Sequence, residues 1–510
     1  MTTPAEDDRS ENGASSSGIF LVESDNPGRG PSLGSSNDKL GPFLLAAIVF
    51  YNVSGGPFGI EEAVRSAGAL YTLLGFLLMP LVWSIPEAIV TAELGSTFPE
   101  PAGGVAWVEE AFGERAAWIS GYLGWVAGAT DNAIYPVLFL DYLVQVFFPD
   151  SDTLFGAATW SRFIFVSLTT LILGYVNWRG LKIVGKLSVA VAFIALSPFV
   201  ILITVGVFRI EPRRWLELPA PADPHNNETQ GGFFPSLSLG GIMLRPFLNN
   251  IFWNLNSFDA AASFGGDVTD AATTFPRAMG LSVLFVALGY LIPLMVVIGA
   301  LETNPDDWVD GYIAIAASRI VGPWLGAWTV FAAGVSNIAL FQAELSADSF
   351  QIMGMADRGY LPRIFSERSQ YGTPTYGILL GLAVIATVIT VSNLGQLIEM
   401  LNFSYSISLI IEYAAFLELR RSKPDLERPW RFPFGLVGCV MLLVMPLAFT
   451  LFTMALATFD TLAASIVVVL FGMLLYRLRK CWKAPPYDEV STHAVEQEST
   501  RSNNTGDSGT

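Results

Sequence analysis

The chain has 510 residues, of which 52% are hydrophobic and only 14% are charged. Soluble domains carry about 25% charged residues, so no soluble fold could cover this much apolar surface with polar side chains. The net charge of −17 excludes a basic phosphate-binding surface, and nucleic acid is not an expected partner. Two Cys and two His residues predict neither a disulfide framework nor a metal site, and no cofactor is expected.

Polar, Ser-rich sequence occupies both ends of the chain. Residues 1–39 contain no apolar run and predict a disordered tail without a cleaved signal peptide. Residues 484–510 are also polar and predict a second disordered tail. The remaining residues, 40–483, are expected to form one membrane domain.

Twelve segments between the tails are long and apolar enough to cross about 30 Å of hydrocarbon as helices. They are residues 41–67, 71–95, 116–148, 161–178, 187–208, 243–266, 278–301, 323–350, 375–392, 395–418, 433–456 and 459–478. Continuous apolar runs exclude a β-barrel, whose strands alternate apolar and polar residues. The sequence therefore predicts an all-α polytopic protein in the lipid bilayer, with about 12 transmembrane helices.

Most Lys and Arg residues outside these segments, including Arg420 and Arg428, fall in loops on the side of the two termini. The positive-inside rule then places both termini in the cytosol. The loop 209–242 would face outside, where Asn227-Glu228-Thr229 is a candidate glycosylation site. Plasma membrane is the default location, since no sorting signal separates it from internal membranes.

Two apolar segments are interrupted near their middles. The first contains Val53-Ser54-Gly55-Gly56-Pro57-Phe58-Gly59, and the sixth contains Trp253-Asn254-Leu255-Asn256-Ser257-Phe258-Asp259. The Gly and Pro content of the first cannot sustain a helix, and unwound backbone at membrane depth survives only around an enclosed cavity. Breaks five segments apart predict an inverted five-plus-five repeat with a binding site near the midplane. The alternative is a pair of kinks that allow close helix packing.

Carboxylates inside apolar segments are costly and are functional candidates by default. They are Glu87, Asp131, Asp141, Asp259, Glu344, Asp348, Glu399 and Glu412. Asp131 lies near mid-membrane, Asp259 follows the second break, and Glu344 is one helical turn from the like-charged Asp348. Because the apolar cores contain no Lys or Arg, this pattern predicts a cavity that attracts a cation or holds protons.

Each remaining carboxylate has a structural alternative. Asp141 would be a solvated boundary residue, and Glu399 and Glu412 would be interfacial or bond to neighbouring backbone. Glu87 follows Pro86 and would satisfy backbone groups that this proline frees.

Three aromatic residues lie near the breaks, namely Trp253, Tyr135 and Tyr405. They would either stack on a cationic ligand or simply pack in the core. The N–H groups around Gly55 and Gly56 suit a carboxylate, but Pro57 removes one donor. The residues therefore favour an amine without a carboxylate.

Several motifs resemble those of the amino acid–polyamine–organocation (APC) superfamily. Pro86-x5-Ala92-Glu93-Leu94-x4-Pro99-x3-Gly103-Gly104-x2-Trp107 is similar to its second-segment signature. More narrowly, the chain resembles the polyamine uptake transporters of plants and protists over about residues 40–480. The strings that carry this resemblance are VSGGPFGIEEAV (53–64), WSIPEAIVTAEL (83–94), DNAIYPVLFLDYL (131–143), NWRGLKIVG (177–185), FWNLNSFDAAASFGGDV (252–268), AELSADSFQIMGMADRGYLP (343–362) and ERPWRFPFG (427–435).

The resemblance implies a LeuT-like fold and proton-coupled import of putrescine, spermidine or related polyamines by alternating access. Carried over position by position, it implies that substrate is bound by Asp131, Asn132, Trp253, Asn256, Asp259 and Glu344, with Asn402 and Tyr405 in a looser tenth-segment pattern. Gly55 and Gly56 at the first break complete the candidate binding residues. Lys186 departs from the plant pattern, and it either replaces the sodium of sodium-coupled relatives or is a snorkelling anchor.

Three other functions compete with polyamine import. An amino acid permease of the same fold would use Gly55 and Gly56 to bind a carboxylate, and a non-transporting sensor would bind ligand without moving it. No disulfide-linked heavy chain is expected as a partner, because Cys439 lies in an apolar segment and Cys481 in a cytosolic tail. An enzyme has no nucleophile–base pair or phosphate loop to support it.

Overall fold

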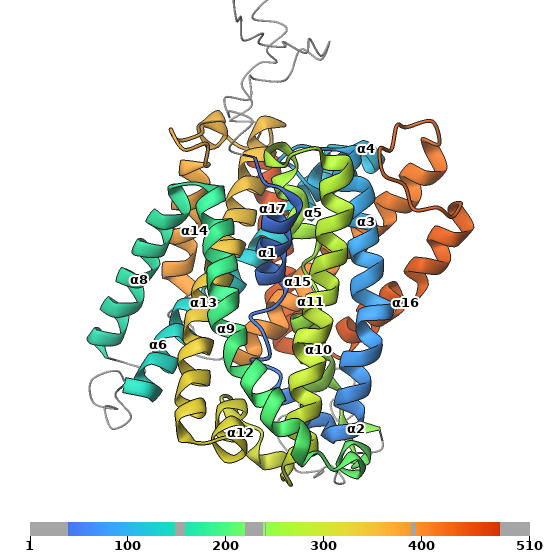
Figure 1. Ribbon diagram of the computed structural model, residues 1–510. Helices are drawn as coiled ribbons and strands as arrows, with labels where there is room; N and C mark the ends of the chain where they lie inside the picture. Colours follow the sequence, from blue (N-terminus) through green and yellow to red (C-terminus); the bar gives the residue numbers. More distant parts are fainter. Residues whose placement is uncertain (1–38, 148–158, 220–237, 240, 389–393, 480–510) are drawn as a thin grey trace, which may run out of the picture.

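The computed structural model describes residues 39–147, 159–219, 238–239, 241–388 and 394–479. Apart from Lys39, both predicted tails lie outside these residues, as does the candidate glycosylation site at Asn227. The chain forms a bundle of long helices, in which α1 (Pro42–Val53) lies in the interior while α8 (Trp160–Trp178) and α16 (Leu436–Ala455) lie on opposite flanks (Figure 1).

The other elements follow in chain order. The α-helices are α2 (Glu61–Met79), α3 (Ile85–Thr97), α4 (Gly104–Phe112), α5 (Glu114–Asn132), α6 (Ile134–Phe147), α9 (Leu181–Gly206), α10 (Leu244–Leu255), α11 (Ala271–Ala300), α12 (Tyr312–Ile320), α13 (Pro323–Asp357), α14 (Thr375–Val388), α15 (Leu394–Ser422) and α17 (Phe459–Leu478). A π-helical turn, η2 (Pro80–Ser84), joins α2 to α3, and the 3₁₀ segments are η3 (Val207–Arg209), η4 (Pro212–Leu216), η6 (Asp259–Asp267), η7 (Pro305–Asp307) and η8 (Arg363–Ser366). Strands β1 (Ser238–Leu239) and β2 (Ile242–Met243) form a small antiparallel pair.

Seven helical stretches within the described part of the chain are long and apolar enough to cross a membrane. They are Glu61–Thr97, Leu181–Arg209, Ala271–Ala300, Pro323–Asp357, Leu397–Ser422, Leu436–Ala455 and Phe459–Leu478. Two shorter apolar helices, α1 and α14, accompany them. The chain is therefore a helical integral membrane protein.

The break predicted in the first apolar segment separates α1 from α2. Gly56 and Gly59 have φ values of +94° and +74°, which residues with a β-carbon rarely adopt. A second change of direction occurs inside α2 at Gly68, where φ is +71° and ψ is −179°. The residues before Gly68 thus finish the first predicted segment, and those after it begin the second.

The break predicted in the sixth segment separates α10 from η6. Helix α10 ends at Leu255, Ser257 has a φ of +74°, and the 3₁₀ segment η6 continues from Asp259. Both interruptions therefore fall within the glycine- and asparagine-rich stretches that the sequence marks.

Helix α13 runs the length of the bundle, from the end where α12 lies to the end where α4 lies (Figure 1). At its start Gly326 packs against the carbonyl of Ala314 in α12. At its other end Arg358 donates to Glu109 of α4 over 2.6 Å and to Glu100 over 2.7 and 3.1 Å. We refer below to the α12 end and the α4 end of the bundle.

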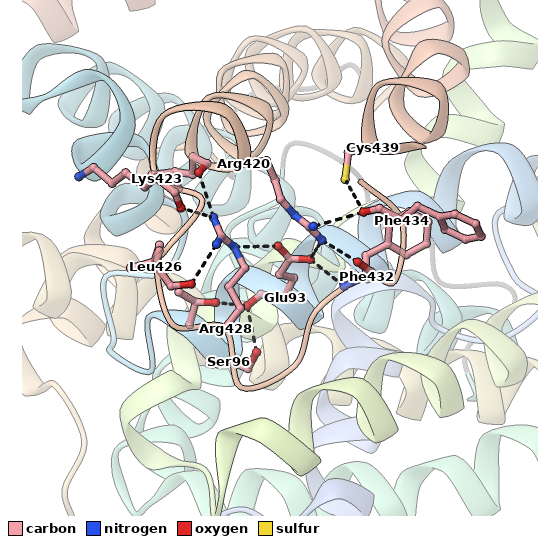
Figure 2. Close-up of polar contacts among 11 residues, drawn as sticks. Glu93, Ser96, Arg420, Lys423, Leu426, Arg428, Phe432, Phe434 and Cys439 are labelled. Carbon is pink, nitrogen blue, oxygen red and sulfur yellow. Dashed lines mark hydrogen bonds and ion pairs between the residues drawn. The ribbon is translucent and has the colours of Figure 1, made fainter. Parts of the chain in front are cut away.

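A buried ion triad joins α3 to the end of α15 and the loop that follows it (Figure 2). Glu93 of α3 pairs with Arg420 and, over 3.2 Å, with Arg428, and the three side chains are 0–2% exposed. Arg428 also donates to the carbonyls of Leu419 and Lys423, at the end of α15 and just after it. The two arginines, counted among the loop charges in the sequence, therefore hold that loop against α3.

Candidate functional site

Side chains replace the helical partners that the first break removes. Asn250 and Asn254 on α10 donate to the carbonyl of Gly59 over 2.8 and 3.3 Å, and Ser336 on α13 donates to the carbonyl of Gly55. The N–H of Gly56 donates to Ser54 Oγ over 3.1 Å. The unwound backbone is thus bound to its neighbours, as the membrane interior requires.

Glu87 satisfies the N–H groups that the second break frees. Its Oε1 accepts from Phe258 N over 2.7 Å and from Asp259 N over 3.4 Å, at the start of η6. The sequence predicts that Glu87 accepts from backbone N–H groups freed by Pro86 in its own helix, and this prediction is wrong. The carboxyl group instead accepts from backbone N–H groups of another segment. A carboxyl oxygen that belongs to the protein therefore already occupies the N-terminus of η6.

Two polar cavities adjoin these breaks. The first has a cavity volume of about 60 Å³ and includes Asn52, Tyr142, Asn254, Tyr290, Ser336 and Asn337 in its lining. The second has a cavity volume of about 50 Å³, and its lining includes Gly128, Asp259, Glu344, Asp348, Gln351 and Tyr405. Along α13 the first cavity touches residues nearer the α12 end, and the second touches residues nearer the α4 end. No Lys or Arg is among the described residues that line either one.

Asp131 lies where the two cavities meet. It lines both, together with Trp253, Asn256 and Ser257. Trp253 Nε1 donates to Asp131 Oδ1 over 2.9 Å, and Tyr135 OH donates to Oδ2 over 2.5 Å. These two donors fix the orientation of the carboxylate and leave its charge facing the cavities.

Asp259 forms a cluster with Tyr405 and Glu87. The Tyr405 hydroxyl contacts Asp259 Oδ1, lies 3.1 Å from Glu87 Oε1 and accepts from the N–H of Ser257 over 3.2 Å. Because the hydroxyl has one proton, it can donate to one of the two carboxylates at a time. The predicted residues Asp259 and Tyr405 are thus brought together with Glu87.

The other predicted residues differ in whether they line a cavity. Asn256 lines both cavities, Gly55 and Glu344 line one each, and Asn402 donates to the carbonyl of Asn249 over 3.1 Å. Asn132 is fully buried, lines neither cavity, and has no hydrogen-bond partner among the described residues. Two further predicted residues, Gly56 and the exposed Lys186, also line neither cavity.

Three carboxylates outside the cavities have hydrogen-bond or ion-pair partners within the protein. Glu399 accepts from the N–H of Thr458 at the start of α17 over 2.5 Å, and Asp141 pairs with Arg162 over 2.5 Å. Glu412 is buried and accepts from Ser408 Oγ over 3.3 Å.

Sequence reasoning missed several residues that bond the breaks or line the first cavity. Asn250 was not singled out, although its spacing of four from Asn254 places both amides on one helical face of an apolar segment. Ser336, Asn337 and Tyr290 were also missed, because single polar residues in long apolar runs are common. The paired amides were the one available signal.

We predict that Tyr405→Phe lowers the stability of the purified protein by about 1–3 kcal/mol, because a carboxylate and the Ser257 N–H lose their partner. Thermal unfolding in detergent would measure this. Tyr413→Phe is the matched control, since Tyr413 is on the same helix and its buried hydroxyl has no partner within the described part. Equal effects of the two substitutions would contradict the prediction.

Discontinuous membrane helices around a polar cavity near the bundle centre are the arrangement typical of solute permeases. Residues 40–474 match the amino acid permease family. The chain belongs to this family, and it is therefore a transport protein and not an enzyme.

Its relatives include several plant transporters. The chain is 42% identical over 448 residues to a probable polyamine transporter of Arabidopsis thaliana, covering 87% of this chain and 88% of that one. It is 38% identical over 446 residues to the polyamine transporter PUT1 of Oryza sativa, covering 88% and 79%. It is 22% identical over 411 residues to the mouse solute carrier family 7 member 13, covering 79% and 82%.

Proposed function

We propose that this protein imports polyamines of the putrescine and spermidine class, coupled to protons, by alternating access. The observation that carries the proposal is the charge of the cavities, whose described lining contains Asp131, Asp259, Glu344 and Asp348 and no basic residue. Buried carboxylates require a cation or protons, and a polyamine supplies several ammonium groups. The polyamine transporters among the relatives support the same substrate class.

An amino acid permease is the competing function, and the breaks argue against it. A substrate carboxylate needs free N–H groups at a helix terminus. At the second break Glu87 accepts the N–H groups of Phe258 and Asp259, and at the first the N–H of Gly56 donates to Ser54. An amine without a carboxylate does not need these donors.

For the bound substrate we infer that Asp131 holds one ammonium group and Glu344 another. Trp253 would add a cation–π face beside Asp131, and Asp259 is the next candidate. Lys186 is exposed and lines neither cavity, which favours the snorkelling anchor over a role in ion coupling.

We further infer a LeuT-like arrangement of twelve membrane crossings with an inverted repeat. The first break is bound to α10 through Asn250 and Asn254, and the second break is bound to α3 through Glu87. These contacts around two interrupted helices support this arrangement. In the proposed orientation both termini and the α4 end are cytosolic, the α12 end is outside, and the protein resides in the plasma membrane.

The test is uptake of radiolabelled spermidine into cells that express the chain, at pH 5.5 and 7.5. We expect faster uptake at the acid pH, inhibition by excess putrescine, and no inhibition by arginine or leucine. A protonophore should remove the acid stimulation, because it collapses the driving gradient.

Two outcomes would overturn the proposal. Uptake of leucine or arginine in place of spermidine would favour the amino acid permease, and binding of spermidine without accumulation would favour a sensor. Spermidine uptake that ignores pH and the protonophore would refute proton coupling alone.

A further inference from the structure

Two carboxylates on one face of α13 are buried without a donor. Glu344 and Asp348 are 7% and 5% exposed and line the second cavity one helical turn apart. Neither makes a hydrogen bond or an ion pair with any residue that the structure describes. Burial of an unpaired carboxylate is strongly unfavourable, so this pair requires a cation or protons.

The other carboxylates near this cavity have protein donors. Asp131 accepts from Trp253 and Tyr135, while Asp259 contacts the hydroxyl of Tyr405. A ligand cation near those groups must share them with protein donors. At Glu344 and Asp348 a ligand can supply all the donors, and its electrostatic gain is largest there.

The backbone of α5 brings the two carboxylates together. A β-carbon on Gly128 would lie 2.3 Å from Asp348 Oδ1 and 2.8 Å from Glu344 Oε1. Both oxygens are thus close to one point on α5, where only glycine leaves them room. One small cationic group can therefore contact both carboxylates.

We propose that Glu344 and Asp348, held against Gly128, form a subsite for the second ammonium group of an amine whose first ammonium is at Asp131. The inference rests on the proposed function, and it adds Asp348 and Gly128 as residues that determine specificity.

The spacing of the two subsites suits a diamine. Asp131 is three residues after Gly128 on α5, so their β positions are about 5–6 Å apart on one helical face. Four methylene groups separate the two nitrogens of putrescine, which gives a span of similar length. The subsite should therefore make the protein select amines with two separated charges over monoamines.

The experiment compares putrescine with n-butylamine as inhibitors of spermidine uptake, because the two amines share a four-carbon chain and differ by one charge. In the wild type we expect putrescine to inhibit at about ten- to hundredfold lower concentration than n-butylamine. The quantity compared between variants is the ratio of the half-inhibitory concentration of n-butylamine to that of putrescine. Asp348→Asn should reduce this ratio about tenfold, and Glu344→Gln with Asp348→Asn should bring it close to one. Asp460→Asn, an exposed carboxylate on α17, should leave the ratio unchanged.

A glycine substitution tests the geometry without changing any charge. Gly128→Ala should push both carboxylates aside and reduce the ratio several-fold. Gly280→Ala on α11 is its control, because Gly280 lines neither cavity and no described atom lies within 4 Å of the β-carbon that the substitution would add. Thermal shifts of the purified variants with each amine provide a second measurement where surface expression falls.

The outcomes separate this inference from the proposed function. Absence of polyamine uptake by the wild type would refute the function itself. Wild-type uptake with a ratio near one, or equal losses for both amines in Asp348→Asn, would refute the subsite alone. An unchanged ratio with an altered pH dependence would make the pair a proton carrier, which also overturns the subsite.

Discussion

Glu93→Gln is expected to destabilise the protein by about 3–5 kcal/mol, because it leaves two buried guanidinium groups without a counter-charge. Glu93 is 0% exposed and pairs with Arg420 and Arg428, whose side chains are 2% and 1% exposed. It also accepts the N–H of Phe432 over 2.9 Å, so it holds the loop after α15 directly. The apparent Tm in detergent should fall by roughly 5 °C or more.

The control is Glu418→Gln at an ion pair near the same end of α15. Glu418 pairs with Arg421 over 2.9 Å, but the arginine side chain is 69% exposed, so the expected change is below about 1 kcal/mol. Adding Arg428→Gln to Glu93→Gln should restore part of the lost stability, since it removes one uncompensated charge. If Glu93→Gln and Glu418→Gln unfold at the same temperature, the triad does not stabilise this loop.

The interrupted helices could be predicted because their cause is local. Glycine tolerates the positive φ values at Gly56 and Gly59, and a proline between them removes a donor, so the break is encoded in consecutive residues. The ion triad could not be predicted in this way. Arg428 is more than three hundred residues from Glu93, and a cationic residue in a loop is usually solvated.

The candidate site likewise contains residues that could be predicted from local sequence and residues whose role depends on tertiary packing. Asp131 and Glu344 could be found because a carboxylate in an apolar segment is costly wherever its partner lies. The partner of Glu87 could not be found, since its bonds to Phe258 and Asp259 depend on how α3 meets η6. The role that we infer for Gly128 also depends on packing, because one glycine among many in membrane helices has no distinguishing neighbour in sequence.

Asp131→Asn is expected to cause the largest loss of transport. If Asp131 binds an ammonium group at the junction of the cavities, removal of its charge costs about 2–5 kcal/mol of binding free energy. This loss corresponds to a rise of about thirtyfold to more than a thousandfold in the half-saturating spermidine concentration. The measurement is the initial rate of uptake over a range of spermidine concentrations, normalised to the amount of protein at the surface.

Two substitutions separate the charge of Asp131 from its surroundings. Tyr135→Phe removes the hydroxyl that donates over 2.5 Å but keeps the carboxylate, so we expect at most about a tenfold change. Trp253→Phe keeps an aromatic face beside the substrate while removing the indole donor, whereas Trp253→Leu removes both and should cost about 1–2 kcal/mol more. An Asp131→Asn variant that transports as well as Tyr135→Phe would show that this carboxylate orients its neighbours and does not bind the amine.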